Sequence, residues 1–181
     1  MFILYSVLIG LIVGVLAGGR TAGLAALQFR WPAAITVGLL AQVVLFSDAV
    51  AARIGDLGPV LYVGSTLLVV AAIVRNRAIA GMPVVVAGAV CNLAAIVANG
   101  GYMPASRAAL EAAGQTAPAF YSNSSVVPDP ALRILTDIFA LPPWLPFANV
   151  FSLGDVLIGV GIAAVIVLAM RRPAVTPVSA A

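Results

Sequence analysis

The chain has 181 residues, of which 63% are hydrophobic and only 8% are charged. A water-soluble domain of this length cannot cover its surface with so few polar side chains. All nine basic residues are Arg and there is no His, which removes the commonest metal ligand and the usual proton shuttle. We therefore expect no metal site and no cofactor. The net charge of +3 reflects arginines in loops and indicates no surface for nucleic acid.

Five long apolar runs, nearly free of charged residues, account for most of the chain. A bilayer core of about 30 Å needs roughly 20 apolar residues per helix, and each run extends at its ends through small or weakly polar residues. The pattern predicts an all-α integral membrane bundle of five transmembrane helices. The predicted spans are Phe2 to Leu16, Ala33 to Phe46, Val60 to Val74, Pro83 to Ala98 and Val156 to Met170.

The arginines predict the orientation, because short loops rich in Arg stay in the cytoplasm. Acidic and basic residues nearly balance in the connections after the second and fourth spans. We therefore expect a multi-pass protein of the cell membrane, with its N-terminus outside and its C-terminus in the cytoplasm. Residues 1–172 should form a single membrane domain, and 173–181 a flexible cytoplasmic tail. The arginines on the predicted cytoplasmic side are Arg20, Arg30, Arg75, Arg77, Arg171 and Arg172.

Glycines recur every four residues along the first span, at Gly10, Gly14 and Gly18. This spacing gives one face where another helix backbone can approach closely. Packing within the chain is the favoured interpretation, and an oligomer formed through the same face is the alternative.

Asn92 lies in the middle of the fourth span, where an unpaired amide would be costly. It should therefore face the bundle and bond across helices. Gln42 and the pair Ser65 to Thr66 lie at a suitable depth to be its partners.

The longest connection is the predicted outer loop, residues 99–151, and a loop of this length usually has a function of its own. It begins with a tight turn at Asn99. A short Ala-rich helix follows, which Ser106 should cap and Gly114 should end.

Asp129 and Pro130 predict the start of a second helix in the outer loop, through about Ala140. Its apolar residues fall on one face, which is typical of a helix lying in the membrane interface. Arg133 and Asp137 are four positions apart on the other face and can pair.

Leu141 to Phe147 contains three prolines and two aromatic residues, Trp144 and Phe147. Prolines stiffen the backbone, and aromatic side chains favour the headgroup layer. The segment should form a rigid, proline-rich interfacial strap that leads into the fifth span.

The fifth span begins near Ser152 and Asp155, whose spacing matches a variant of the capping box. An Asp at membrane depth is costly and often functional. Here the carboxylate would also meet the positive end of the helix dipole, so a structural role is slightly favoured.

Asn92, Asn99 to Pro104, Leu135 to Pro142 and Asn149 to Asp155 together resemble a bacterial family of uncharacterised polytopic membrane proteins, the domain-of-unknown-function family 5317. The resemblance covers nearly the whole chain. It implies a multi-pass membrane protein and assigns no activity.

More distantly, the last two spans are similar to lipoprotein signal peptidase, an aspartic membrane protease. Phe151 to Asp155 fits the second motif of that family, with Ser152 in place of an Asn. The first motif keeps Asn92 but has Ala95 where the family carries a catalytic Asp. Aspartic proteolysis needs two carboxylates that share a proton, so one catalytic group is missing.

Two classes of function remain open. We favour a non-enzymatic protein that binds membrane lipids, a small apolar ligand or a partner membrane protein at its outer face. The alternative is an outward-facing aspartic membrane hydrolase, related to lipoprotein signal peptidase, in which Asp155 works with Asp137. The residues expected at the ligand site are Asn92, Asn99, Tyr102, Trp144, Asn149 and Asp155.

Overall fold

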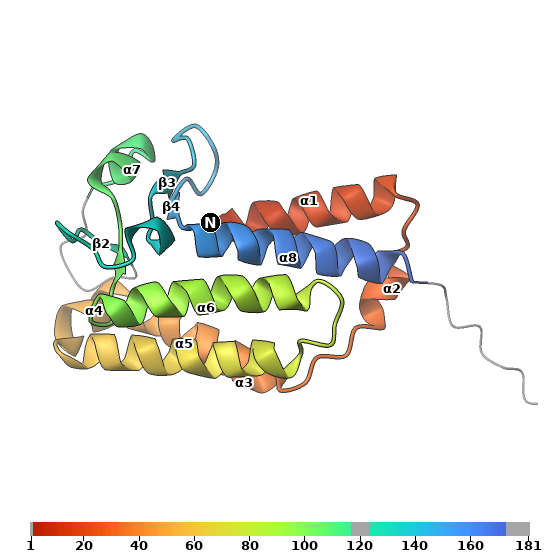
Figure 1. Cartoon of the computed structure of the whole chain (residues 1–181), viewed down its shortest axis with the longest axis horizontal. Coiled ribbons are helices and arrows are strands. Elements are labelled where there is room, and N and C mark those ends of the chain that lie inside the picture. The colour runs from red at the N-terminus through yellow and green to blue at the C-terminus, as the bar shows by residue number, and fades with distance from the viewer. Residues whose placement is uncertain (1, 117–123, 173–181) are drawn as a thin grey trace, which may run out of the picture.

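The five apolar runs fold into five long helices, which lie side by side in a computed structural model, with a cap of loops and short elements at one end of the bundle (Figure 1, left). The structure describes residues 2–116 and 124–172. The predicted tail, 173–181, lies outside the described residues. The long helices are α1 (Phe2–Leu16), α3 (Pro32–Leu45), α5 (Leu57–Arg75), α6 (Met82–Ala98) and α8 (Leu153–Met170).

Shorter helices connect the long ones. At the end of the bundle opposite the cap, α2 (Ala22–Ala25) packs against α8. At the cap end, α4 (Asp48–Ile54) follows α3 after a bend of 78°. The predicted Ala-rich helix is α7 (Arg107–Ala112), where Ser106 Oγ accepts a hydrogen bond from Ala109 N.

The cap also contains short strands, so the fold is mostly helical and the prediction of an all-α fold was incomplete. In one pair, β1 (Met103–Pro104) runs parallel to β2 (Ser124–Ser125). In the other, β3 (Phe139–Ala140) runs antiparallel to β4 (Val150–Phe151). Both pairs join separate segments of the outer loop to each other.

The predicted interfacial helix from Asp129 to Ala140 does not form. Only a 3-10 turn, η1 (Arg133–Leu135), is helical, and Leu132 before it has a left-handed φ of 51°. Asp137 N donates instead to Pro104 O at 2.9 Å. Bonds of this kind to another segment take the backbone groups that a helix would use, so the local apolar pattern was misleading. Because Thr136 is extended, Arg133 and Asp137 do not share a helical face, which the predicted pairing required.

The long helices pack in the order α1, α8, α6, α5, α3. Glycines of α1 face α8: a Cβ on Gly10 would lie 2.9 Å from Ala163 Cα, and a Cβ on Gly14 would lie 3.1 Å from Met170 Cε. The predicted glycine face is therefore occupied by a helix of the same chain. Gly18, with a φ of +75°, lies in the turn after α1, away from this contact.

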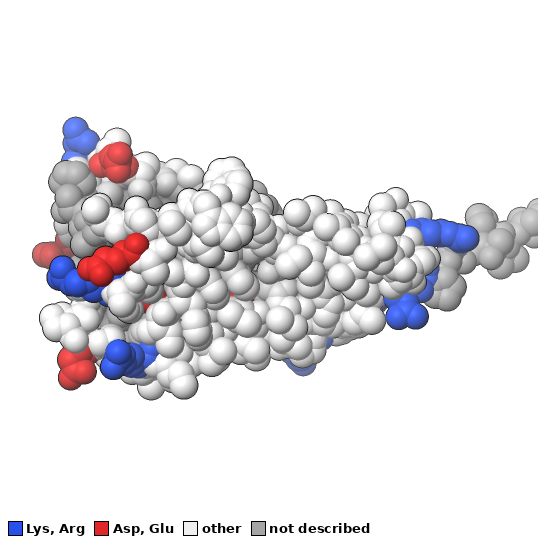
Figure 2. Space-filling model, turned by 90° about the horizontal axis from the view of Figure 1, so that it is seen from above, with Lys and Arg blue, Asp and Glu red and all other residues white. Residues whose placement is uncertain are grey.

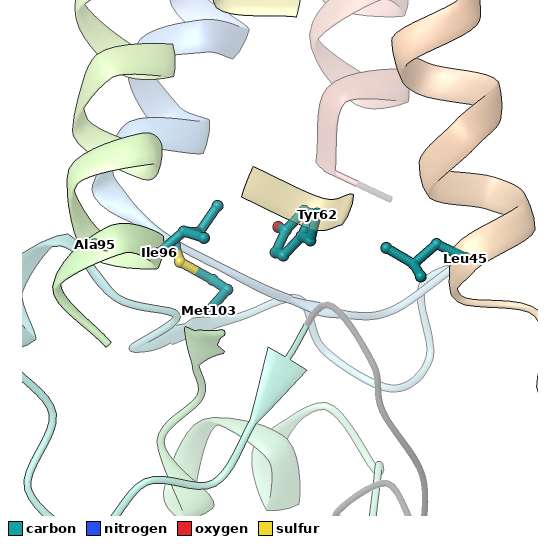
Figure 3. Packing of buried hydrophobic residues seen from close by; sticks show 5 residues of the cluster. All are labelled: Leu45, Tyr62, Ala95, Ile96 and Met103. Carbon is teal, nitrogen blue, oxygen red and sulfur yellow. The ribbon is translucent and has the colours of Figure 1, made fainter. Parts of the chain in front are cut away.

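An apolar core joins the bundle to the cap where α3, α5 and α6 meet β1 (Figure 3). Phe46 contacts Tyr62 edge to face, with ring centroids 4.9 Å apart. The core consists of Leu45, Tyr62, Ala95, Ile96 and Met103.

Membrane-spanning capacity differs among the long helices. Of the described helices, α5 and α8 are each long and apolar enough to cross a bilayer, and α3 with α4 passes the same test only as one broken span. The other two apolar helices are shorter, since α1 has 15 residues and α6 has 17. Length and composition therefore support two or three spans.

Charged side chains gather at the two ends of the bundle and leave its middle almost free of charge (Figure 2). All six acidic residues and three arginines belong to the cap end. The opposite end, in the part that the structure describes, has the other six arginines and no acid.

Candidate functional site

The candidate site forms where α6 and α8 approach each other closely, at Gly88 and Gly154. A Cβ on Gly154 would lie 2.7 Å from Gly88 O, and a Cβ on Gly88 would meet Gly154 O and Ile158 N. Because neither residue has a side chain, the two backbones can touch. Asn92, one turn after Gly88, thereby reaches the first turn of α8.

Asn92, Ser152 and Asp155 form a closed hydrogen-bond network, called here the Asn92 network. Asn92 Nδ2 donates to Asp155 Oδ1 at 2.8 Å, and Ser152 Oγ donates to Asn92 Oδ1 at 2.8 Å. The capping box completes it: Ser152 N donates to Asp155 Oδ2 and Asp155 N donates to Ser152 Oγ, both at 3.0 Å. Each of the three residues therefore forms a hydrogen bond with both of the others.

The capping box at the start of α8 confirms the prediction made for Ser152 and Asp155. The partners predicted for Asn92 were wrong. Gln42 Nε2 donates to Thr66 Oγ1 at 3.2 Å, so these two polar groups satisfy each other. The reason is the packing order, in which α3 lies on α5 while α6 lies on α8.

Asp155 has a donor for each carboxylate oxygen and lies in the first turn of α8, where the helix dipole favours negative charge. No described arginine pairs with it. Its charge is therefore stabilised by N–H groups alone, as at other helix N-termini. The arrangement can fix the start of α8 against α6.

Asp137, the second carboxylate of the hydrolase hypothesis, is 5% exposed and lies between η1 and β3. Its backbone is held from the segment around β1, since Ser106 N donates to Asp137 O at 2.9 Å. Among the described residues, no hydrogen bond joins Asp137 to Asp155. Ala95, which the sequence resemblance would align with a catalytic Asp, is fully buried in the apolar core (Figure 3).

Asn99 acts as a clamp between α6 and the outer loop. Its Oδ1 accepts from Ala131 N at 2.9 Å, and its Nδ2 donates to Ala131 O at 2.9 Å. The same Nδ2 donates to Ala95 O, one turn back in α6, at 2.7 Å. The side chain that was predicted to bind a ligand is thus occupied by the chain itself.

The strap, Leu141–Phe147, is tied to the bundle and to the rest of the cap. Tyr5 of α1 donates from its hydroxyl to Pro146 O at 2.6 Å. Gln115 Nε2 donates to Ala148 O, just after the strap, at 2.9 Å. These bonds hold the segment beside the start of α1.

Two of the predicted ligand residues lie in or next to this strap. Trp144 is 77% exposed, and its neighbour Phe147 is 68% exposed with a left-handed φ of 58°. Asn149 is half-buried, and its Nδ2 donates to Val150 O at 2.8 Å. Tyr102, beside β1, is also half-buried.

The structure thus joins two of the six predicted ligand residues directly, Asn92 and Asp155, and adds Ser152 to them. The sequence signal for Ser152 was present in the capping box, but its bond to Asn92 depends on the helix contact. Among the described residues, no group of three or more His, Cys, Asp or Glu side chains could hold a metal ion.

Comparison with curated proteins finds no match, and comparison with solved structures finds none. A family of unknown function, DUF5317, matches residues 26–167. The matched range contains α3 to α7 and most of α8, and therefore both halves of the Asn92 network. This chain accordingly belongs to the DUF5317 family.

Proposed function

We propose that this protein is a non-enzymatic membrane protein with five spans, which binds lipid at its outer face through the strap. The observation that carries the proposal is the exposure of Trp144 and Phe147 on a segment that hydrogen bonds hold to the bundle. A tethered segment with exposed aromatic side chains loses little conformational entropy on entering the headgroup layer, where such side chains are favoured.

Exposed apolar side chains support membrane insertion of the two shortest long helices, α1 and α3. In water, burial of such side chains is worth about 1.5–3 kcal/mol each, so their exposure to water would be costly. By a rise of about 1.5 Å per residue, α1 covers about 22 Å, which a locally thinned bilayer accommodates. The side chains include Leu4, Leu8, Ile9 and Ile12 of α1, and Val37, Leu40, Val43 and Val44 of α3.

Charge placement supports the proposed orientation. The end with six arginines and no acid would lie in the cytoplasm, and the cap end would lie outside. The strap, the Asn92 network and the start of α1 would then face the outer leaflet together.

Hydrolysis has weaker support from the geometry. Both oxygens of Asp155 accept hydrogen bonds within the Asn92 network, so neither is free to activate water without breaking that network. The second carboxylate would have to come from Asp137, which the backbone pairing with Pro104 and Ser106 holds in the cap.

Tryptophan fluorescence tests the outer-face proposal, because Trp31 and Trp144 are the only tryptophans. The variant Trp31→Phe leaves Trp144 as the sole emitter, and Trp144→Phe is the matched control. The variants are reconstituted in phosphatidylcholine vesicles that carry bromine either near the headgroup or deep in the acyl chain. We expect shallow bromine to quench Trp144 more strongly than deep bromine. Quenching by aqueous iodide alone would place the strap in water and overturn the proposal.

A further inference from the structure

The end of the bundle opposite the cap carries a concentrated positive charge that the proposed outer-face function does not use. Its six arginines are all exposed. Within the described residues none of them forms an ion pair, and no acidic residue lies at this end. Uncompensated charge of one sign on a rigid surface favours an anionic partner.

One set of arginines lies where α1 and α8 end, and is called here the Arg20 group: Arg20, Arg171 and Arg172. Arg20 N donates to Met170 O at 2.8 Å, which fixes its backbone beside Arg171. A Cβ on Gly23 of α2 would lie 2.9 Å from the carbonyl carbon of Ala169, so α2 is pressed against the end of α8.

The other set surrounds a buried amide and is called here the Asn76 group: Arg30, Arg75 and Arg77. Asn76, which is 3% exposed, accepts from Arg30 N at its Oδ1 and donates from Nδ2 to Arg30 O, both at 2.7 Å. Arg75 and Arg77 flank Asn76 in sequence. One buried side chain therefore brings arginines from two connections together.

We propose that these two groups bind the phosphates of anionic phospholipids in the cytoplasmic leaflet. The guanidinium fork of Arg matches phosphate oxygens in pairs, and it is less strongly hydrated than the ammonium of Lys. The inference rests on the membrane insertion proposed above, but it concerns the opposite face of the protein.

Apolar side chains beside the arginines favour a lipid over other anions. Trp31 follows Arg30 directly and is 56% exposed, and Phe29 on its other side is exposed as well. Leu16, near the Arg20 group, is also exposed. A phospholipid carries its phosphate next to its acyl chains and can therefore contact the arginines and these apolar side chains together. A nucleic acid or an acidic peptide would leave the apolar side chains in water.

Two triple variants with equal changes in charge test the proposal. Arg30→Gln, Arg75→Gln and Arg77→Gln together remove the Asn76 group, whereas Arg53→Gln, Arg107→Gln and Arg133→Gln remove the three arginines of the cap end. The full-length proteins are purified in a neutral detergent and titrated with phosphatidylglycerol or phosphatidylcholine. Native mass spectrometry counts the bound lipids, and thermal unfolding checks that both variants remain folded.

We expect the unchanged protein and the cap-end variant to retain phosphatidylglycerol in preference to phosphatidylcholine. Loss of the Asn76 group should weaken phosphatidylglycerol binding roughly tenfold or more, since each arginine near an anionic surface contributes about 1 kcal/mol. Equal weakening in both variants would show a dependence on net charge alone and overturn the proposal, as would equal binding of the two lipids by the unchanged protein. Failure of the unchanged protein to reconstitute into the phosphatidylcholine vesicles of the fluorescence experiment would instead overturn the proposed membrane insertion.

Discussion

Gly88 and Gly154 lie so close together that a side chain on either residue would meet the backbone carbonyl of the other. Such mutual contact between two glycines lets α6 and α8 pack backbone to backbone, as small residues do in membrane helix pairs. The hydrogen bond from Asn92 to Asp155 depends on this distance. A helix pair separated by ordinary side chains would leave the amide and the carboxylate out of reach of each other.

Gly88→Ala and Gly154→Ala should each lower the free energy of unfolding in detergent by about 1–3 kcal/mol, because an added methyl group overfills a packed contact. Thermal unfolding of purified variants measures the effect. Gly64→Ala is the matched control, since a Cβ on Gly64 of α5 would meet nothing within 4 Å. Alanine there should leave stability unchanged or raise it by up to about 1 kcal/mol, because glycine is a poor helix former. Equal destabilisation at all three positions would contradict the importance of the contact.

The sequence predicted much of the helical architecture, because long apolar runs leave few alternatives. The start of α8 was also predictable, since the capping box is a local pattern of Ser152 and Asp155. The partner of Asn92 was not, because depth in a bilayer does not say which helices are neighbours. The prediction of an interfacial helix was wrong for a related reason. The backbone of Asp137 bonds to Pro104, and no local sequence pattern could reveal that contact.

Asn92→Leu should lower the free energy of unfolding by about 1–3 kcal/mol, since Ser152 and Asp155 would each lose a half-buried hydrogen-bond partner. Thermal unfolding in detergent measures this, and Gln42→Leu, which breaks the separate bond to Thr66, serves as a comparison for a half-buried amide. A double variant of Asn92→Leu with Asp155→Leu should cost less than the sum of the two single changes. Strict additivity would show that the two residues do not act as one network.

Asn76 and Asn99 use the same arrangement at opposite ends of the bundle. Each follows the last residue of a long helix, bonds to the carbonyl four residues back, and binds both backbone groups of one distant residue. Asn99→Ala should therefore accelerate hydrogen exchange around Ala131, and Asn76→Ala around Arg30. Each variant is the control for the other, because the expected changes lie at different ends. Unchanged protection from hydrogen exchange around both Ala131 and Arg30 would mean that the two Asn side chains do not hold these segments in place.

The proposed orientation predicts the outcome of reporter fusions. A reporter placed after Arg77 or after Arg172 should register as cytoplasmic, and one inserted near Gln115 should register as external, because the arginine-rich connections are retained inside. The double variant Arg75→Glu with Arg77→Glu reverses the charge of one predicted cytoplasmic connection. It should reduce the fraction of correctly oriented protein. An external signal from the fusion at Arg172 would exclude five spans with an outer N-terminus.

Substitution of Asp155 distinguishes a structural role of the Asn92 network from a catalytic one. Asp155→Asn removes the charge but keeps one oxygen for Ser152 N. A flip of the Asn92 side-chain amide would exchange its oxygen and nitrogen. The oxygen of Asn92 would then accept from the amide introduced at position 155, and its nitrogen would donate to Ser152 Oγ, so the network can re-form. We therefore expect a loss of only about 1 kcal/mol in thermal unfolding.

The functional effect of Asp155→Asn should be partial under the proposed non-enzymatic role, whereas a catalytic carboxylate would be inactivated completely. Asp137→Asn is the paired test, because two carboxylates that share one proton work as a unit and lose activity together. The measurement is complementation of a deletion strain, with each variant's abundance checked by immunoblot. Complete loss in both variants at normal abundance would favour the hydrolase. Retention of function by either variant leaves the carboxylate pair without a catalytic role, because a single carboxylate cannot both activate water and donate a proton.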